Sequence, residues 1–172
     1  MPKKVAVLMG SDSDLETMQA GVDVLEDLGI ECEVRIMSAH RTPADVTRFV
    51  KGASVKEIGV IVAGAGLAAH LAGVVAAHTR LPVIGVPMQA GGLQGLDALL
   101  STVQMPPGIP VGTVAIGKVG AKNAAWMAAR ILALSDEALA KRLDKAMKAM
   151  SSDVRAKDRK LQKERKKNGK KS

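Results

Sequence analysis

Histidine, arginine and serine residues stand in short loops that each follow a short apolar run. His40 and Arg41 lie in the stretch 38–43, Ser-Ala-His-Arg-Thr-Pro. A histidine can exchange a proton near neutral pH, and an arginine can hold a phosphate or carboxylate group through two hydrogen bonds. A capped helix start explains Thr42 and Pro43 but neither His40 nor Arg41. We therefore favour a functional role for these two side chains.

The loop of residues 10–14, Gly-Ser-Asp-Ser-Asp, is the second candidate. Backbone N–H groups at a helix start, together with the hydroxyls of Ser11 and Ser13, make a natural cradle for phosphate. Asp12 and Asp14 would repel phosphate, so a carboxylate here is better suited to accept hydrogen bonds from ribose hydroxyls. Plain helix capping would explain one of these polar residues, but not four in a row.

A third loop, Gly64-Ala65-Gly66, precedes His70. Glycine lets a backbone come close to a ligand. The loop lacks the full G-x-G-x-x-G spacing and the ribose-binding acid further on, so a dinucleotide is not expected. His70 lies in an apolar segment, and a core position and a direct role remain equally open. The three histidines and Cys32 form no chelating spacing, so we expect no metal site.

The apolar runs predict five strands, over residues 4–9, 31–37, 58–63, 81–86 and 111–116. Helical spacing predicts helices over residues 15–28, from Thr42 and Pro43 onward, and over residues 67–78, 95–104 and 121–134, and Ser135 is expected to cap a last helix. This order predicts an α/β three-layer sandwich: a flavodoxin-like, five-stranded parallel sheet with a C-terminal helical extension. Ligands bind beyond the carboxyl ends of such strands, so the three loops should share one edge.

Composition agrees with a single globular domain, since the chain has 172 residues of which 47% are hydrophobic. A lone cysteine forms no internal disulfide, and Cys32 is expected to be a small buried hydrophobe beside Val34 and Ile36. No run reaches the roughly 20 apolar residues of a membrane span. The first residues lead directly into a strand and leave no room for a signal peptide, so we expect a cytoplasmic protein.

The net charge of +8 comes entirely from residues 155–172, and the rest of the chain is neutral. We expect residues 1–153 to form one catalytic domain that includes a C-terminal helix. Residues 154–172 are expected to be a basic tail that is mobile or a frayed helix and is dispensable for catalysis, because like charges repel one another and bury little. A neutral body does not predict a nucleic-acid partner.

Several motifs occur in the order typical of one enzyme family: MGSDSD at 9–14, SAHRTP at 38–43, AGAGLAAHL at 63–71, PVIGVP at 82–87, GLDALLSTVQMPPGIPVGTVAIG at 95–117 and GAKNAA at 120–125. In these motifs the chain resembles the N5-carboxyaminoimidazole ribonucleotide mutases, the class I form of the phosphoribosylaminoimidazole carboxylase family. The resemblance implies conversion of N5-carboxyaminoimidazole ribonucleotide to 4-carboxyaminoimidazole ribonucleotide in purine biosynthesis, without cofactor or metal. It also implies a homo-octamer whose sites are shared between subunits.

The resemblance also implies roles for individual residues. His40 would be the general acid and base. Ser11, Ser13, Asp14 and Arg41 would hold the ribose phosphate, Ser38 and Ala39 would line the same site, and His70 with Gly64, Ala65 and Gly66 would shape the pocket in which the carboxyl group is released and recaptured.

Three alternatives stay open. A class II relative carboxylates aminoimidazole ribonucleotide directly with CO₂, although such members tend to carry lysine at the position of Arg41. A non-catalytic nucleotide or flavin sensor could use the same fold. A nucleic-acid-binding protein could act through the basic tail.

Overall fold

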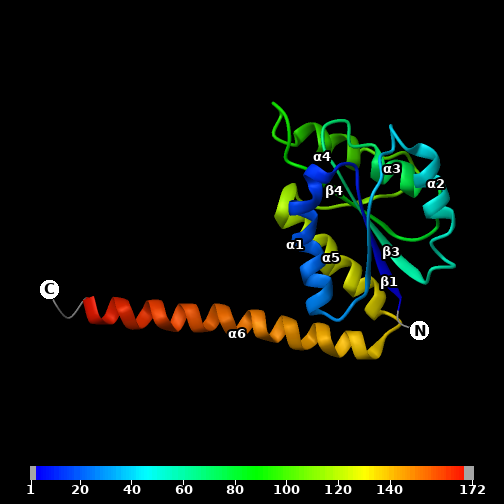
Figure 1. The fold of residues 1–172 in the computed structure, drawn as a ribbon. Helices are drawn as coiled ribbons and strands as arrows, with labels where there is room; N and C mark the ends of the chain where they lie inside the picture. The colour runs from blue at the N-terminus through cyan, green and yellow to red at the C-terminus, as the bar shows by residue number, and fades with distance from the viewer. Residues whose placement is uncertain (1–2, 169–172) are drawn as a thin grey trace.

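A five-stranded, all-parallel sheet forms the centre of the protein in a computed structural model that describes residues 3–168 (Figure 1). The strands are β1 (Lys4–Met9), β2 (Cys32–Ile36), β3 (Ile58–Ala65), β4 (Val83–Pro87) and β5 (Gly112–Thr113). Their order is β2-β1-β3-β4-β5. This order is that of flavodoxin-like sheets, and it confirms the predicted fold class.

Helices cover both faces of the sheet. They are the 3₁₀ turn η1 (Asp12–Asp14) and the helices α1 (Leu15–Asp27), α2 (Pro43–Lys51), α3 (Leu71–Ala76), α4 (Leu96–Val103), α5 (Gly117–Ala133) and α6 (Glu137–Asn168). Successive side chains of β1 enter two separate apolar cores. Val5 and Val7 join α1 and α5 on one face, whereas Ala6 and Leu8 join α2 and α3 on the other. Burial on both faces explains why the central strands are apolar without alternation.

Three predicted boundaries are wrong in informative ways. Helix α3 begins at Leu71 instead of residue 67, because Leu67 adopts a left-handed backbone with φ of 55° and the chain reaches the helix through a loop. The last strand shrinks to two residues at the sheet edge. Asp136 caps α6 in place of Ser135, because Asp136 directly precedes the helix and its carboxylate accepts a hydrogen bond of 2.9 Å from the Leu139 N–H.

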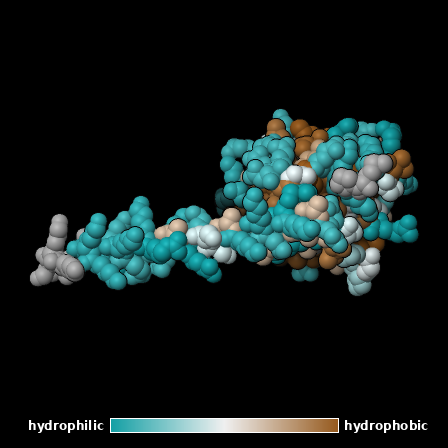
Figure 2. Space-filling model, turned by 90° about the horizontal axis from the view of Figure 1, so that it is seen from below, coloured by the Kyte–Doolittle hydropathy of each residue, from teal (hydrophilic) through white to brown (hydrophobic). Residues whose placement is uncertain are grey.

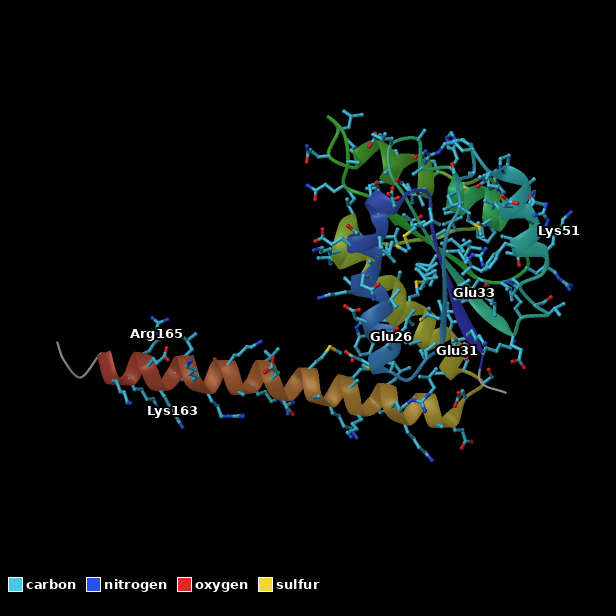
Figure 3. The ribbon with its side chains drawn as sticks, in the orientation of Figure 1. Glu26, Glu31, Glu33, Lys51, Lys163 and Arg165 are labelled. Carbon is cyan, nitrogen blue, oxygen red and sulfur yellow. The ribbon has the colours of Figure 1, made fainter. Side chains whose placement is uncertain are left out.

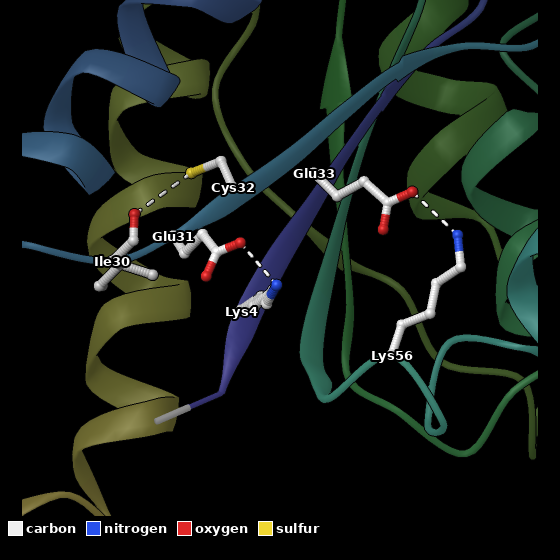
Figure 4. A network of polar contacts seen from close by, with 6 residues as sticks. All are labelled: Lys4, Ile30, Glu31, Cys32, Glu33 and Lys56. Carbon is white, nitrogen blue, oxygen red and sulfur yellow. Dashed lines mark hydrogen bonds and ion pairs between the residues drawn. The ribbon is translucent and has the colours of Figure 1, made fainter. Parts of the chain in front are cut away.

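Strand β2 also differs from the prediction. Val34 and Ile36 are 38% and 54% exposed, because β2 lies at the edge of the sheet. Cys32 is half-buried, and burial together with nearby carboxylates raises the pKa of its thiol to about 11, so it remains protonated at neutral pH. On this edge Lys4 donates to Glu31, and Lys56 donates to Glu33 at 2.9 Å (Figure 4).

Helix α6 leaves the body as a single continuous rod. Leu139 and Leu143 are buried against the body, but Met147 and Met150 are 42% and 48% exposed. The helix continues without a break through residue 153 and projects away from the sheet (Figures 1 and 2). The described part of the predicted tail is therefore helical, while its dispensability for catalysis stays a prediction. Among residues 3–168, no helix has both the length and the apolar character needed to cross a membrane.

Candidate active site at the carboxyl edge of the sheet

The loops that follow β1, β2 and β3 meet beside one cavity of about 490 Å³. The chain passes from β1 to β2 on one side and then to β3 on the other, so the cavity lies at the point where the strand order reverses. Ligands of open α/β sheets bind at such a point. The cavity is lined by Gly10, Ser11, Ser13, Asp14, Ser38, Ala39, His40, Arg41, Ala65, Gly66, Leu67, Ala68, His70, Leu71 and Ala90.

His40 and His70 meet at this cavity. Nε2 of His40 lies 2.8 Å from Nδ1 of His70, and the two rings are nearly perpendicular, with centroids 4.9 Å apart. One of these nitrogens must carry a proton and the other must accept it. Both residues are exposed, so His70 is not a core histidine. The structure thus joins two residues, from the loops after β2 and β3, that sequence reasoning treated separately.

Ser38 and Thr42 fix the backbone that carries His40. The Ser38 hydroxyl accepts hydrogen bonds from the N–H groups of His40 and Arg41, at 3.3 and 3.1 Å. The Thr42 hydroxyl accepts from the Ser38 N–H at 2.9 Å and donates to the Ser38 carbonyl. Thr42 occupies the predicted cap position of α2, but its side chain closes the loop and makes no cap bond to the helix.

Arg41 connects this loop to the one after β1. Its guanidinium donates to the Gly10 carbonyl at 3.2 Å. This bond uses one of five guanidinium donors and leaves others for an anion in the cavity. Arg41 therefore lies beside the hydroxyls of Ser11 and Ser13, which form a hydrogen bond of 2.9 Å with each other.

The acids of the 10–14 loop have separate surroundings. Asp12 accepts hydrogen bonds from the Ser11 hydroxyl and from the Ser13 N–H, at 3.0 and 3.1 Å. These hydrogen bonds hold the loop that carries Ser11 and Ser13, and Asp12 itself does not line the cavity. Asp14 does line it, and burial raises the pKa of its carboxyl group against the opposing effect of hydrogen bonds from Ser11 and Ser13.

Gly64 is the one predicted site residue outside the cavity lining. It is buried, and a Cβ at this position would lie 2.5 Å from the Met88 Cε and 2.6 Å from the Met18 Sδ. Gly64 therefore provides packing space beneath the site. Sequence reasoning did not single out Gly10, Leu67, Ala68, Leu71 and Ala90 as lining residues. Only their position near the end of a strand could have indicated these residues. Their side chains are apolar or absent, so residue type gave no sign of a functional role.

A model of the AIR carboxylase family matches residues 4–153. The chain belongs to the AIR carboxylase family. It is 58% identical to an N5-carboxyaminoimidazole ribonucleotide mutase from Brucella melitensis, over 90% of this chain and 95% of the relative. It is 51% identical to the protein of that name from Escherichia coli strain K12, over 89% and 90% of the two chains.

A solved structure agrees with this assignment. The crystal structure of Treponema denticola PurE superposes with a TM-score of 0.84 at 31% identity, covering 92% of this chain and 98% of that one. The family predicted from the sequence motifs is confirmed, and the protein is an enzyme of this family.

Proposed function

We propose that this enzyme converts N5-carboxyaminoimidazole ribonucleotide to 4-carboxyaminoimidazole ribonucleotide, with His40 as both general acid and general base. The observation that carries the proposal is the cavity in which a hydrogen-bonded histidine pair faces an arginine and two serine hydroxyls. A single phosphorylated substrate can be held by the hydroxyls and the arginine while its base faces the histidine.

The reaction requires two proton transfers in opposite directions. In the first step protonated His40 gives its proton to the amine nitrogen as the bond from nitrogen to the carboxyl carbon breaks, which leaves CO₂ and aminoimidazole ribonucleotide. In the second step the ring carbon attacks CO₂ with its electron pair, and neutral His40 removes the proton from that carbon. His40 ends as it began, so one positioned histidine serves both steps.

The walls of the cavity suit the intermediate stage. Ala39, Ala65, Leu67, Ala68 and Leu71 present apolar atoms beside the histidine pair. A small neutral molecule such as CO₂ is held in place by exclusion of water and by shape. His70 is a positioning residue in this proposal, because its hydrogen bond fixes the ring of His40.

The phosphate side of the substrate belongs to other residues. We assign the phosphate to Arg41, Ser11 and Ser13, and the ribose hydroxyls to the carboxyl group of Asp14. Ser38 holds the loop and lines the same wall. Binding and proton transfer are therefore divided between different side chains of one cavity.

The two candidate substrates test the proposal. Purified enzyme is given either N5-carboxyaminoimidazole ribonucleotide without added bicarbonate, or aminoimidazole ribonucleotide with CO₂, and formation of 4-carboxyaminoimidazole ribonucleotide is followed. We expect rapid turnover of the first substrate at concentrations where the second reacts slowly. Preference for the second would make the protein a direct carboxylase. Turnover of neither, with retained nucleotide binding, would indicate a non-catalytic module.

A further inference from the structure

Helix α6 carries a continuous basic surface on the part that projects from the body. Arg155, Arg159, Lys163 and Lys167 follow one another at four-residue intervals, so they form a row along one side of the helix. All four neighbours of Lys163 on the helix surface, at three and four residues to either side, are basic. We define this basic face as Arg155, Arg159, Lys160, Lys163, Lys166 and Lys167.

The acidic residues of this segment do not neutralise the basic face. Asp158 lies three residues after Arg155, and Glu164 lies four residues after Lys160 and lines a surface pocket together with Lys163. These are two carboxylates against six basic side chains. Lys157 pairs with Asp153 at 2.7 Å, but Lys157 is outside the basic face. Within residues 3–168, no member of the face forms an ion pair, and all six are exposed. Figure 3 shows Lys163 and Arg165 leaving α6 on opposite sides, which places Arg165 off the face as well.

We propose that the basic face of α6 binds nucleic acid through its phosphate backbone. The row from Arg155 to Lys167 is about 18 Å long, at 1.5 Å per residue. Phosphates follow one another every ~3.4 Å along each strand, so such a row can contact about four to six of them. No base contact is implied, because the face carries charge but no aromatic side chain on which a base could stack.

The distribution of apolar residues disfavours an anionic membrane. A helix that lies on a bilayer inserts an apolar face, and its lysines flank that face at the headgroups. In α6, Val154 and Leu161 lie on the side opposite Lys163, seven residues apart. Inserting them would turn the basic face toward water. The neighbours of Leu161 on the helix surface are Lys157, Asp158, Glu164 and Arg165, which are two bases and two acids.

This binding is a property added to the family fold. The family model ends at residue 153, before the first residue of the basic face. The body does not share the excess charge, because the net charge of +8 resides in the last eighteen residues. The inference is therefore independent of the proposed catalytic reaction.

Fluorescence anisotropy of the full-length protein tests the proposal with two probes, a single-stranded RNA and a duplex DNA of about 20 nucleotides per strand. We expect binding of at least one probe at about 50 mM salt, and an affinity lower by about 10²-fold or more at 200 mM. Failure of both probes to bind at the lower salt concentration would overturn the proposal.

Two double variants with equal charge loss test the basic face itself. Arg159→Gln with Lys163→Gln removes two members of the face, whereas Lys157→Gln with Arg165→Gln removes one lysine and one arginine outside it. We expect the first pair to weaken binding at least about tenfold and the second less than about threefold. An equal loss of affinity in the two double variants would overturn the proposal that nucleic acid binds on one side of the helix. Helix content by circular dichroism checks that both variants keep α6.

Vesicle sedimentation tests the membrane alternative, and substrate turnover tests whether the variants keep an intact active site. Binding to vesicles rich in phosphatidylglycerol, measured by sedimentation at the same salt concentration, is expected to be weaker than binding to nucleic acid, because headgroup attraction acts without apolar insertion. Capture by vesicles without nucleic-acid binding would assign the face to a membrane and overturn the proposal. Substrate turnover by both double variants should equal that of the unmodified enzyme, since neither pair touches the cavity.

Discussion

At the scale of single residues, His40 and the phosphate-holding side chains contribute to different steps. His40 lies against His70, while Arg41 lies against the loop after β1. Removing one group therefore leaves the surroundings of the other intact. This separation allows turnover and binding to be tested independently on single variants.

His40→Asn is expected to lower turnover by at least roughly 10²-fold, because positioned proton transfer contributes about 10²–10⁴-fold and one residue serves two transfers. Nucleotide affinity should persist in this variant. Arg41→Ala and Ser11→Ala should weaken nucleotide binding first. Steady-state kinetics and calorimetric titration on the same three proteins measure both quantities. Near-normal turnover in His40→Asn would move the proton chemistry to another group, with His70 the next candidate.

Asp14→Asn is expected to stabilise the enzyme without ligand near neutral pH. Burial raises the pKa of the Asp14 carboxyl above its value in the unfolded chain, so folding favours the protonated form. The stability from this group is complete below the unfolded pKa of 3.8, and is lost as pH rises through the folded pKa. Because the carboxyl is half-exposed, we expect less than about 4 °C of gain in melting temperature.

Calorimetric scans between pH 3 and pH 8 check this expectation for Asp14. The difference between the two proteins should be largest at neutral pH and should vanish at the acid end. Lower stability of the variant at neutral pH would contradict this expectation, because it would mean that the folded protein favours the ionised form of Asp14. Weaker substrate binding by the same variant would agree with a role for Asp14 toward the ribose.

Loop identities could be predicted from the sequence because strands, turns and caps depend on near neighbours. The contact between His40 and His70 could not, since the residues are 30 positions apart and meet only because β2 and β3 both flank the loop after β1. Gly64 shows a different limit: the sequence motif predicts a role in shaping the pocket, but not that an added Cβ at this position would meet Met18 and Met88.

At the scale of elements, helices α1 and α5 hold the loop after β1 in place. They pack closely at Gly21, where a Cβ would lie 2.6 Å from the Ala121 carbonyl oxygen. Lys118 at the start of α5 adds an ion pair of 2.6 Å with Glu16. Because Ser11 and Ser13 lie just before α1 begins, their position depends on the packing of α1 against α5 at Gly21.

Gly21→Ala is expected to destabilise the enzyme by about 1–3 kcal/mol, because the added methyl group meets backbone atoms that cannot rotate away. This loss exceeds the gain of up to about 1 kcal/mol that alanine brings to a helix interior. Gly52→Ala is the matched control, since its Cβ would lie 3.5 Å from the nearest atom. Thermal unfolding of both variants is the measurement, and equal melting temperatures would contradict the close-packing argument.

Helix ends and sheet edges were the least predictable elements. The apolar pattern of residues 67–70 suits a helix, but the loop conformation at Leu67 delays α3 to Leu71. The pattern of Val34 and Ile36 suits a buried face, but an edge strand lacks the cover that a central strand receives. These differences arise from tertiary position, which a local pattern does not contain.

At the scale of the whole molecule, helix α4 presents an apolar stripe to solvent. Leu96, Leu100 and Val103 share one side of the helix and are 51%, 49% and 48% exposed. Brown patches on the body in Figure 2 show further apolar surface. A contiguous patch of this kind is typical of a surface between protein chains.

We expect a stable homo-oligomer, and the octamer implied by the family resemblance is the preferred state. Light scattering at low micromolar concentration should give a mass near eight times that of one 17.9 kDa chain. Leu100→Glu, with Asp144→Lys as a control on exposed α6, should reduce that mass in the first variant only. A mass near that of one chain for the unmodified protein would refute the expectation.

The hydrogen bond between the histidines has a consequence for the proton count in the cavity. With nitrogens 2.8 Å apart, the pair keeps its bond only while one proton lies between them. A ring that gives up a proton on its other nitrogen leaves the proton between the two rings in place, so the hydrogen bond persists with the same donor and acceptor. The two rings can thus keep one shape through successive charge states, so the site need not reorganise between releasing and recapturing its carboxyl group.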